Sequence, residues 1–473
     1  MGLRKKFRDF RDWCPQPSDR LSTKLKRYSM PIAAVITTTL ILSVSFFAFS
    51  SSITSHPLLP IAPIFNAPAS ATPTLLWKYN TSSVEEGYGA SSPVVVNDVV
   101  YTSDENNYVY ALNATDGAQL WNYLTGGGAD SPAVDNGIVY VNTDFTIDAV
   151  NATNGAQLWS NEPQYDIPVG FSSPTVVNGV VYAGTTNSLD SRKGNVYAMN
   201  AKDGNTLWST PSFTGFGTVY SSPTVSNGVV YIGVEGAVDE VVLSTTSPYY
   251  GVYALGAKSG AQLWNFTTGY SVEDSPVVVG GVIYFVTYEG NFFALNAKNG
   301  LQLWNYTTGI PTGNVFNVDS SPDVVGGVVY VGSDDGNVYA LNAASGAKLW
   351  NYTIGNGTLS TPTIANGVVY VGSSDNNIYA LNATNGVELW SYPTSGAVDS
   401  PAVVNGVLYV GGGDNVYALK VSSPEAPSSA SYPTWIWAIG IAVLVLIIVA
   451  AAVVLILKKK LKFGVKNRFA SEI

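Results

Sequence analysis

The stretch that decides the fold is Val328–Thr353, which reads VVYVGSDDGNVYALNAASGAKLWNYT. It holds short alternating apolar segments, of which Asn337–Asn342 is one, then a glycine turn and Leu349-Trp350. Variants of it recur from one end of the chain to the other. Self-similarity at a period of roughly 20–50 residues indicates a repeat architecture, so this 473-residue chain is interpreted by its period.

Three landmarks recur along the chain, and the first two are present in every copy. The first is a Ser/Thr-Pro that opens an apolar strand, where proline suits a position needing no ladder donor. It occurs at Pro93, Pro132, Pro174, Pro223, Pro276, Pro322, Pro362 and Pro401. The second is a two-residue turn of a kind that tolerates positive φ, as a type I′ hairpin demands. It occurs at 97–98, 136–137, 178–179, 227–228, 280–281, 326–327, 366–367 and 405–406.

The third landmark is an eleven-residue segment from Ala to Trp, typified by Ala340–Trp350, with Gly346 four residues before the tryptophan. The glycine lets a third strand turn back into a fourth. Each unit is therefore predicted to be a four-stranded antiparallel meander, the size of a propeller blade. Seven copies end in a tryptophan: Trp121, Trp159, Trp208, Trp264, Trp304, Trp350 and Trp390.

The ends of the repeat region give the number of blades. The eighth copy stops at Val421 without a glycine turn or tryptophan, and residues 75–79, which contain Trp77, form an unpaired fourth strand ahead of the first copy. Joining the two fragments completes a blade and leaves no long exposed sheet edge. Residues 75–421 are therefore predicted to form an all-β, eight-bladed propeller closed by the Trp77 strand.

The Ala-to-Trp segment resembles the tryptophan-docking motif of quinoprotein-type propellers, which carry pyrroloquinoline quinone (PQQ)-like repeats. In that family the pattern is roughly A-x-D-x-x-T-G-K-x-x-W, and the tryptophan packs between neighbouring blades. Here the third position is mostly Asn, as in Asn342, and it is Gly256 in one copy. The resemblance implies that Trp77 and the seven tryptophans named above dock the blades.

The family contains both enzymes and scaffolds. Its alcohol and glucose dehydrogenases hold PQQ and calcium in the axial funnel, whereas another member is a lipoprotein that scaffolds outer-membrane protein assembly. The enzymes usually carry insertions, a catalytic Asp with calcium ligands and sometimes a vicinal disulfide. The repeat region here has near-minimal blades, no cysteine and a single arginine, Arg192. We therefore expect no catalytic residue and no resident cofactor, with PQQ and calcium implied only if the chain is a dehydrogenase.

Composition excludes several other functions. Residues 72–421 contain eight basic and 28 acidic residues, so the repeat region should repel nucleic acid. The chain has one cysteine, Cys14, and one histidine, His56, both outside the repeats. A Cys/His zinc site, an internal disulfide and histidine general-base chemistry in the repeats are therefore excluded.

The segment before the repeats is predicted to anchor the chain. Residues 1–30 form a basic tail, 31–53 are uncharged and apolar, and 54–74 are a Pro/Ala-rich linker. Because 23 helical residues reach about 34 Å, 31–53 is long enough to cross a bilayer. A cleaved signal peptide is the alternative, but the long basic region and long apolar core favour an uncleaved signal anchor.

The segment after the repeats mirrors this arrangement. Residues 422–434 are a Pro/Ser linker, 435–457 a second candidate transmembrane helix, and 458–473 a basic tail. Both apolar segments thus have their basic flank on the side away from the repeats. The positive-inside rule predicts a plasma-membrane protein with both termini in the cytoplasm and the propeller outside.

Four aspartates precede the first strand of their blades and are candidate cation ligands at one mouth of the channel. Capping of the loop that enters each strand is the competing explanation. The four are Asp130, Asp274, Asp319 and Asp399.

One insertion interrupts the repeat, between Gly233 and Tyr253. A rigid ring commonly displays function on irregular loops, so this loop is the leading candidate for partner contact; a tolerated surface insertion is the alternative. Its candidate residues are Glu235, Asp239, Glu240, Tyr249 and Tyr250.

Sequons of the N-x-[ST] type are abundant, partly because the repeat itself favours Asn and Thr. In an extracellular protein they are candidate glycan acceptors. They occur at Asn80, Asn113, Asn151, Asn265, Asn305, Asn351, Asn356 and Asn382.

Three functions fit this sequence. The first is a membrane-anchored, cell-surface propeller that acts as a scaffold for protein or glycan partners. The second is a PQQ-dependent oxidoreductase acting on alcohols or sugars. The third is a carbohydrate-binding or cell-wall-associated module. We favour the scaffold because the anchors are paired, the repeats are acidic and catalytic histidine and cysteine are missing from them.

Overall fold

The computed structural model describes the repeat region in ten stretches. These are residues 72–81, 90–104, 106–162, 172–185, 194–210, 218–235, 250–308, 320–333, 335–355 and 360–421. All of them belong to the second of two compact units, Phe65–Ile473; the first is Met1–Ile64. The predicted transmembrane segments 31–53 and 435–457, the linker 422–434, both tails and residues 54–71 of the first linker lie outside the described stretches. The predicted end of that first linker is corrected by one residue, because Thr74 already belongs to the first strand.

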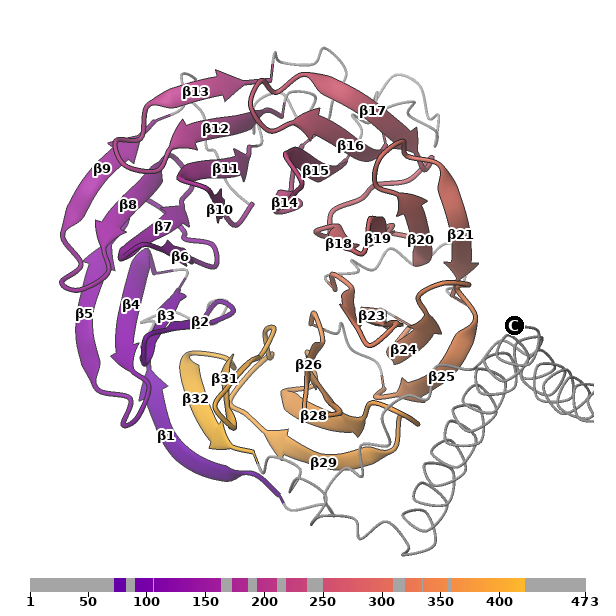
Figure 1. Ribbon diagram of the computed structural model, residues 1–473. Helices are drawn as coiled ribbons and strands as arrows, with labels where there is room; N and C mark the ends of the chain where they lie inside the picture. The colour runs from indigo at the N-terminus through magenta and orange to yellow at the C-terminus, as the bar shows by residue number, and fades with distance from the viewer. Residues whose placement is uncertain are drawn as a thin grey trace, which may run out of the picture. The chain divides into compact units, whose positions relative to one another are not determined.

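The described residues form eight four-stranded antiparallel sheets, which we call blades 1 to 8 in chain order. Within a blade the strands follow one another from the axis outward (Figure 1). Blades 1 to 4 comprise β2 (Val94–Val96), β3 (Val99–Ser103), β4 (Tyr108–Asn113), β5 (Gln119–Leu124); β6 (Ala133–Asp135), β7 (Ile138–Asn142), β8 (Ile147–Asn151), β9 (Gln157–Asn161); β10 (Thr175–Val177), β11 (Val180–Gly184), β12 (Val196–Asn200), β13 (Thr206–Ser209); and β14 (Thr224–Ser226), β15 (Val229–Val234), β16 (Gly251–Gly256), β17 (Gln262–Thr267).

Blades 5 to 7 repeat the plan. They comprise β18 (Val277–Val279), β19 (Val282–Val286), β20 (Asn291–Asn296), β21 (Gln302–Thr307); β22 (Asp323–Val325), β23 (Val328–Ser333), β24 (Asn337–Asn342), β25 (Lys348–Thr353); and β26 (Thr363–Ala365), β27 (Val368–Gly372), β28 (Asn377–Asn382), β29 (Glu388–Pro393). The predicted eight-bladed, all-β architecture is confirmed.

Blade 8 closes the ring with both ends of the repeat region. Its strands are β30 (Ala402–Val404), β31 (Val407–Gly411), β32 (Asn415–Lys420) and, as the outermost strand, β1 (Thr74–Asn80). The β1–β32 pairing is antiparallel, with Thr74 opposite Lys420 and Asn80 opposite Asn415. The predicted closure by the Trp77 strand is therefore confirmed.

The first-to-second-strand turns have the predicted type I′ character. Asn97 and Asp98 have φ of 51° and 58°, and Gly280 and Gly281 have φ of 60° and 80°. Because every blade is a meander, these turns lie at the same end of the blade as the third-to-fourth-strand turns. We call this end the turn face. The other end, which carries the second-to-third-strand connections and the loops between blades, is the loop face.

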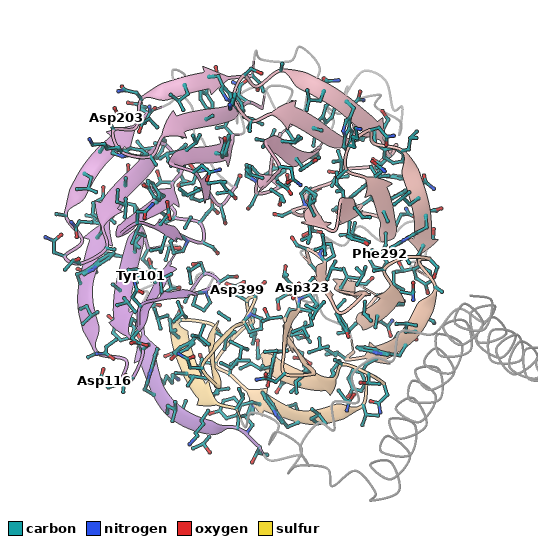
Figure 2. The ribbon with its side chains drawn as sticks, in the orientation of Figure 1. Tyr101, Asp116, Asp203, Phe292, Asp323 and Asp399 are labelled. Atoms are coloured by element: carbon teal, nitrogen blue, oxygen red, sulfur yellow. The ribbon has the colours of Figure 1, made fainter. Side chains whose placement is uncertain are left out.

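Distance from the axis separates two groups of acidic residues (Figure 2). Asp323 and Asp399 lie at the inner edge of the ring, whereas Asp116 and Asp203, both in third-to-fourth-strand turns, lie at the outer rim. Between these radii the second and third strands are almost fully buried, so the hydrophobic core is divided among the spaces between blades.

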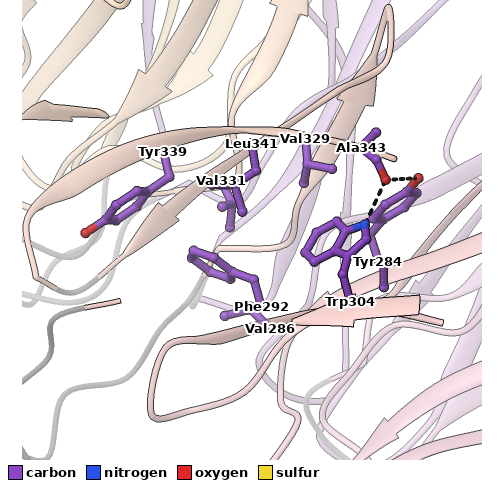
Figure 3. Close-up of a cluster of buried hydrophobic side chains, with 10 residues drawn as sticks. Tyr284, Val286, Phe292, Trp304, Val329, Val331, Tyr339, Leu341 and Ala343 are labelled. Carbon is purple, nitrogen blue, oxygen red and sulfur yellow. Dashed lines mark hydrogen bonds between the residues drawn. The ribbon is translucent and has the colours of Figure 1, made fainter. Parts of the chain in front are cut away.

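One of these spaces, between blades 5 and 6, shows how blades dock (Figure 3). The indole Nε1 of Trp304 and the hydroxyl of Tyr284 both donate to the carbonyl oxygen of Ala343, at 2.9 and 3.2 Å. The two rings lie 5.9 Å apart. Trp304 also covers Gly346 of blade 6, where an added Cβ would lie 2.6 Å from the indole. The glycine thus serves the turn and also leaves room for the indole of the neighbouring blade.

The same arrangement repeats around the ring. Seven indoles donate a hydrogen bond to the carbonyl oxygen of the alanine that follows the third strand of the next blade. The donors are Trp77, Trp121, Trp159, Trp208, Trp264, Trp304 and Trp350. The eighth, Trp390, is partly buried against Tyr370 and packs in the cluster that contains Val421. Blade 8 lacks the glycine turn, so Trp390 has no glycine to cover.

Candidate functional site

At their first position the innermost strands carry four apolar residues, three threonines and one aspartate. These residues are Val94, Ala133, Thr175, Thr224, Val277, Asp323, Thr363 and Ala402. Two of the threonines, Thr175 and Thr363, donate to the proline carbonyl of the following blade, each at 2.6 Å. In blades 4 to 7 the residue before the proline also joins neighbouring blades; for example, the amide of Ser275 donates to Ser321 Oγ at 3.0 Å. The polar groups nearest the axis are therefore used to join blades.

Asp323 is the one carboxylate in this inner set. Its Oδ1 accepts the amide of Val324 at 2.7 Å, and its carboxylate accepts the backbone of Ile364 in the next blade. Burial raises the pKa of Asp323 above its usual value, although these two hydrogen bonds oppose the shift. Asp323 therefore replaces the interblade bond that threonine makes in blades 3, 4 and 7.

The four candidate cation ligands do not form a ligand set in the described part of the chain. Asp130 is half-buried and its carbonyl accepts Ser103 Oγ at 2.6 Å, while Asp399 is exposed at the inner edge (Figure 2). Asp274 is half-buried, and Asp319 lies outside the described stretches. Among the described residues there is no group of three or more His, Cys, Asp or Glu that can hold a metal ion.

The fold family implies a quinone and a calcium ion at the axis, and the described residues do not fit them. Calcium needs several converging oxygens, whereas the first positions of the inner strands offer one carboxylate, Asp323, which already binds backbone amides. All eight tryptophans of the described stretches sit between blades and pair with a tyrosine of their own blade, so none of these is left to cover a quinone.

The loop face of blades 4 and 5 brings several acidic and tyrosine side chains together. Glu235 follows β15 and accepts a short hydrogen bond from Thr218, and Tyr250 precedes β16. These two partner-contact candidates flank the insertion; Asp239, Glu240 and Tyr249 lie outside the described stretches. Both ends of the insertion therefore meet at one site.

Two further carboxylates reach this site from blade 5. Burial raises the pKa of Tyr250, and the charges of Glu235, Glu289 and Glu273 raise it further. Burial also raises the pKa of Tyr220, with Glu235 and Glu273 adding to the effect. We call Tyr220, Glu235, Tyr250, Glu273 and Glu289 the blade 4/5 site; its negative potential favours a cationic partner, and its tyrosine rings offer a surface for one.

Sequence reasoning missed Tyr220, Glu273 and Glu289. Glu289 occupies a second-to-third-strand connection, where other blades carry Asp104 or Asp375, whose carboxylates accept a local backbone amide. Glu289 is an exposed residue, and partial desolvation raises the pKa of its carboxyl against a hydrogen bond from its own backbone amide. The sequence signal that could have pointed to Glu289 is its glutamate, which stands where other blades have an aspartate.

The sequons fall into two groups. Asn113, Asn151 and Asn382 are half-buried, and each accepts the amide two residues on, at 2.8 or 2.9 Å, so their side chains hold the third-to-fourth-strand turn. Those on outermost strands are exposed, and Asn356 lies outside the described stretches. The exposed group is Asn80, Asn265, Asn305 and Asn351.

Fold and docking geometry together define the class: a closed eight-bladed propeller whose blades are joined by tryptophan docking. The chain belongs to the family whose model is described as outer membrane protein assembly factor BamB, which matches residues 66–238, 232–355 and 317–426. No curated protein matches the sequence.

Solved structures agree on the fold and span different kinds of protein. BamB from Moraxella catarrhalis is 18% identical with a TM-score of 0.56, covering 74% of this chain and 98% of that one. Quinohemoprotein alcohol dehydrogenase from Comamonas testosteroni is 19% identical with a TM-score of 0.60, covering 73% and 76%. The computationally designed Ika8 protein is 13% identical with a TM-score of 0.58, covering 71% and 96%. At these identities the likeness establishes the fold alone.

A search of the described stretches for a membrane-crossing helix finds none that is long and apolar enough.

Proposed function

We propose that this protein is a membrane-anchored scaffold whose propeller binds a protein partner on the outer side of the membrane. The observation that carries the proposal is the contrast between axis and loop face. The inner strands use their polar groups to join blades, whereas the blade 4/5 site presents carboxylates and tyrosines beside the insertion. Recognition therefore belongs to the loop face of blades 4 and 5.

The anchoring part of the proposal is supported by sequence. Residues 31–53 and 435–457 are uncharged and apolar, and each has its lysines and arginines on the side away from the propeller. The positive-inside rule then puts the acidic propeller outside the cell. A scaffold tethered at both ends is held close to the membrane, where it meets other membrane or surface proteins at high effective concentration.

An oxidoreductase is the competing function, because quinohemoprotein alcohol dehydrogenase shares the fold. The two structures superpose with a TM-score of 0.60, but the sequences are only 19% identical. A likeness at that identity does not assign the dehydrogenase's active-site residues to this chain. The first positions of the inner strands, where Asp323 is the one carboxylate, favour the scaffold. The family's assembly-factor description supports a protein as the partner.

Photo-crosslinking in intact cells tests the proposal. A photoreactive phenylalanine analogue is placed at position 250 of the full chain, and for comparison at Leu207, which is 54% exposed on the outer strand of blade 3. We expect a discrete adduct from position 250 and none from position 207. Equal labelling from both positions, or an adduct from position 250 unchanged by Glu235→Gln with Glu273→Gln, would overturn the assignment.

A further inference from the structure

Both flanking segments leave the propeller at one point on the turn face. Thr74, the first residue of β1, pairs with Lys420, the last residue of β32. The strand β1 runs away from the turn face and β32 runs toward it, so both linkers start there. The linkers that lead to 31–53 and 435–457 are therefore attached at the turn face, the end of the propeller that a short linker would bring to a membrane.

The second linker keeps the turn face near that membrane. Residues 422–434 number 13, and a flexible chain of that length has an end-to-end distance of about 20 Å. Even fully extended, it reaches only about 45 Å. The turn face is thus the surface of the propeller that the membrane meets most often.

The turn face of blades 5 to 7 is unusually apolar. Blades 5 and 6 each add an exposed aliphatic residue at a hairpin turn to the leucine that most blades expose at the start of the outermost strand. Blade 7 exposes Val387 at its hairpin turn while Leu389 is half-buried, and blade 8 exposes Leu75 and Leu76 beside the start of the first linker. On this face blades 1 to 3 expose only the one leucine, as at Leu120. The blade 5–7 patch comprises Val279 (43% exposed), Leu301 (64%), Leu303 (52%), Val325 (43%), Leu349 (51%) and Val387 (56%). Blades 5 to 7 follow one another up to blade 8, which contains both ends of the repeat region (Figure 1).

Charge divides the turn face in the same way. Over the described stretches, blades 4 to 8 place Lys258, Lys298, Lys348 and Lys420 on this face against one acid, Glu388. Blades 1 to 3 place Asp98, Asp116, Asp135 and Asp203 there against one lysine, Lys202. Aliphatic side chains with neighbouring lysines suit an anionic membrane surface, which the other sector would repel.

We infer that the turn face of blades 5 to 7 rests on the lipid surface, with the blade 5–7 patch among the headgroups and the lysines beside anionic lipid. This rests on the proposed anchoring. It deepens the proposed function, because the propeller is then held in one orientation. The loop face, with the blade 4/5 site, points away from the membrane toward its partner.

Depth-dependent fluorescence quenching tests this orientation on the full chain. In a Cys14→Ser background, single cysteines replace Leu301, Val387 or Phe145 and carry an environment-sensitive dye. Phe145 is the control, since it is 45% exposed on the loop face between β7 and β8. Each protein is reconstituted in vesicles of phosphatidylcholine and phosphatidylglycerol that contain a lipid-attached quencher. We expect labels at 301 and 387 to lose most of their emission and the label at 145 to keep it.

Charge reversal supplies a matched pair of variants. Lys298→Glu with Lys348→Glu should reduce quenching at position 301, whereas Lys202→Glu, in blade 3 on the same face, should leave it unchanged. If the chain stays in the vesicles after a carbonate wash but positions 301 and 145 are quenched alike, the orientation is wrong and the anchoring stands. If the chain is washed off the vesicles, the anchoring and the orientation both fail.

Discussion

The hydroxyl of Tyr409 donates to the carbonyl oxygen of Ala114 at 3.2 Å, although 295 residues separate them along the chain. Trp77 donates to the same oxygen at 2.9 Å. One carbonyl in blade 1 thus receives two donors from blade 8, one from each end of the repeat region. The ring is therefore closed by the same pair of hydrogen bonds, from a tryptophan and a tyrosine to one alanine carbonyl, that joins blades 1 to 7 to one another.

Loss of Trp77 should therefore destabilise the whole ring. Its indole is 8% exposed, and Trp77→Ala removes the bond to Ala114 and the cover over Gly117. We expect a loss of about 3–5 kcal/mol in the free energy of unfolding, measured by urea denaturation. Leu76→Ala, at an exposed neighbour, should stay within about 0.5 kcal/mol. Similar losses for both variants would contradict the docking role of Trp77.

Alanine substitutions at two glycines distinguish the cost of backbone strain from the cost of disturbed packing between blades. Gly346 and Gly327 have φ of 70° and 80°, but an added Cβ meets Trp304 at Gly346 and nothing at Gly327. Gly327→Ala should cost about 1–2 kcal/mol from the backbone alone. Gly346→Ala should cost about 1–3 kcal/mol more, because the indole must shift. Thermal unfolding of both variants gives the difference; equal losses would show that Trp304 does not press on this turn.

Alkali should unfold the ring steeply. Burial raises the pKa of all eight second-strand tyrosines, to about 12 for Tyr140, Tyr330 and Tyr370. Tyrosine has a pKa of about 10 when unfolded, so the stabilisation is complete below that pH and is lost as pH rises toward the folded pKa. The tyrosinate absorbance of these eight residues should appear together with loss of β-sheet circular dichroism. Ionisation of all 29 tyrosines of the chain while the sheet signal persists would contradict this.

A single tyrosine hydroxyl should contribute modestly. In Tyr284→Phe the Ala343 carbonyl keeps Trp304 as a donor, so we expect a loss of about 0.5–1.5 kcal/mol at neutral pH. The variant should also show a weaker alkaline dependence, because one raised pKa is gone. Urea titrations at neutral and alkaline pH measure both effects. A pH dependence identical to that of the unchanged chain would contradict the role given to Tyr284.

Asp323 should lower stability at neutral pH. Its pKa is raised by burial, so the unfolded state loses the proton first; the stabilisation is present at acid pH and is lost as pH rises through the folded pKa. Asp323→Thr installs the residue that bonds the next blade in blades 3, 4 and 7. We expect a gain of about 0.5–1.5 kcal/mol at neutral pH and a smaller one in acid. Destabilisation at neutral pH would indicate that the bonds to Val324 and Ile364 outweigh the burial of charge.

The sequence was sufficient to predict the ring because its signals are local and repeated. The Asn-Gly turns, the Ser-Pro strand starts and the orphan strand around Trp77 each determine a backbone feature, and eight copies in register leave one closed arrangement. At the motif's third position Asn acts as the acceptor that the family's Asp would equally provide. Asn342, like its counterparts, accepts the amide two residues on and holds the turn.

The blade 4/5 site was predicted only in part, because its members come from two blades. Glu235 and Tyr250 flank a visible insertion, whereas Glu273 and Glu289 look like ordinary loop residues of the next copy. Only packing of blade 4 against blade 5 makes their charges act on Tyr250. The patch of exposed aliphatic residues was missed for the same reason, since Leu301 and Val387 become neighbours in a sector only when the ring is built.

The central claim, that the propeller is a scaffold whose axis performs no quinone chemistry, is tested most directly by reconstitution. The purified chain is incubated with PQQ and calcium and supplied with alcohols or sugars and an artificial electron acceptor dye. We predict dye reduction no faster than in the same mixture without the protein. Saturable dye reduction that requires both quinone and calcium would contradict the claim and establish the oxidoreductase.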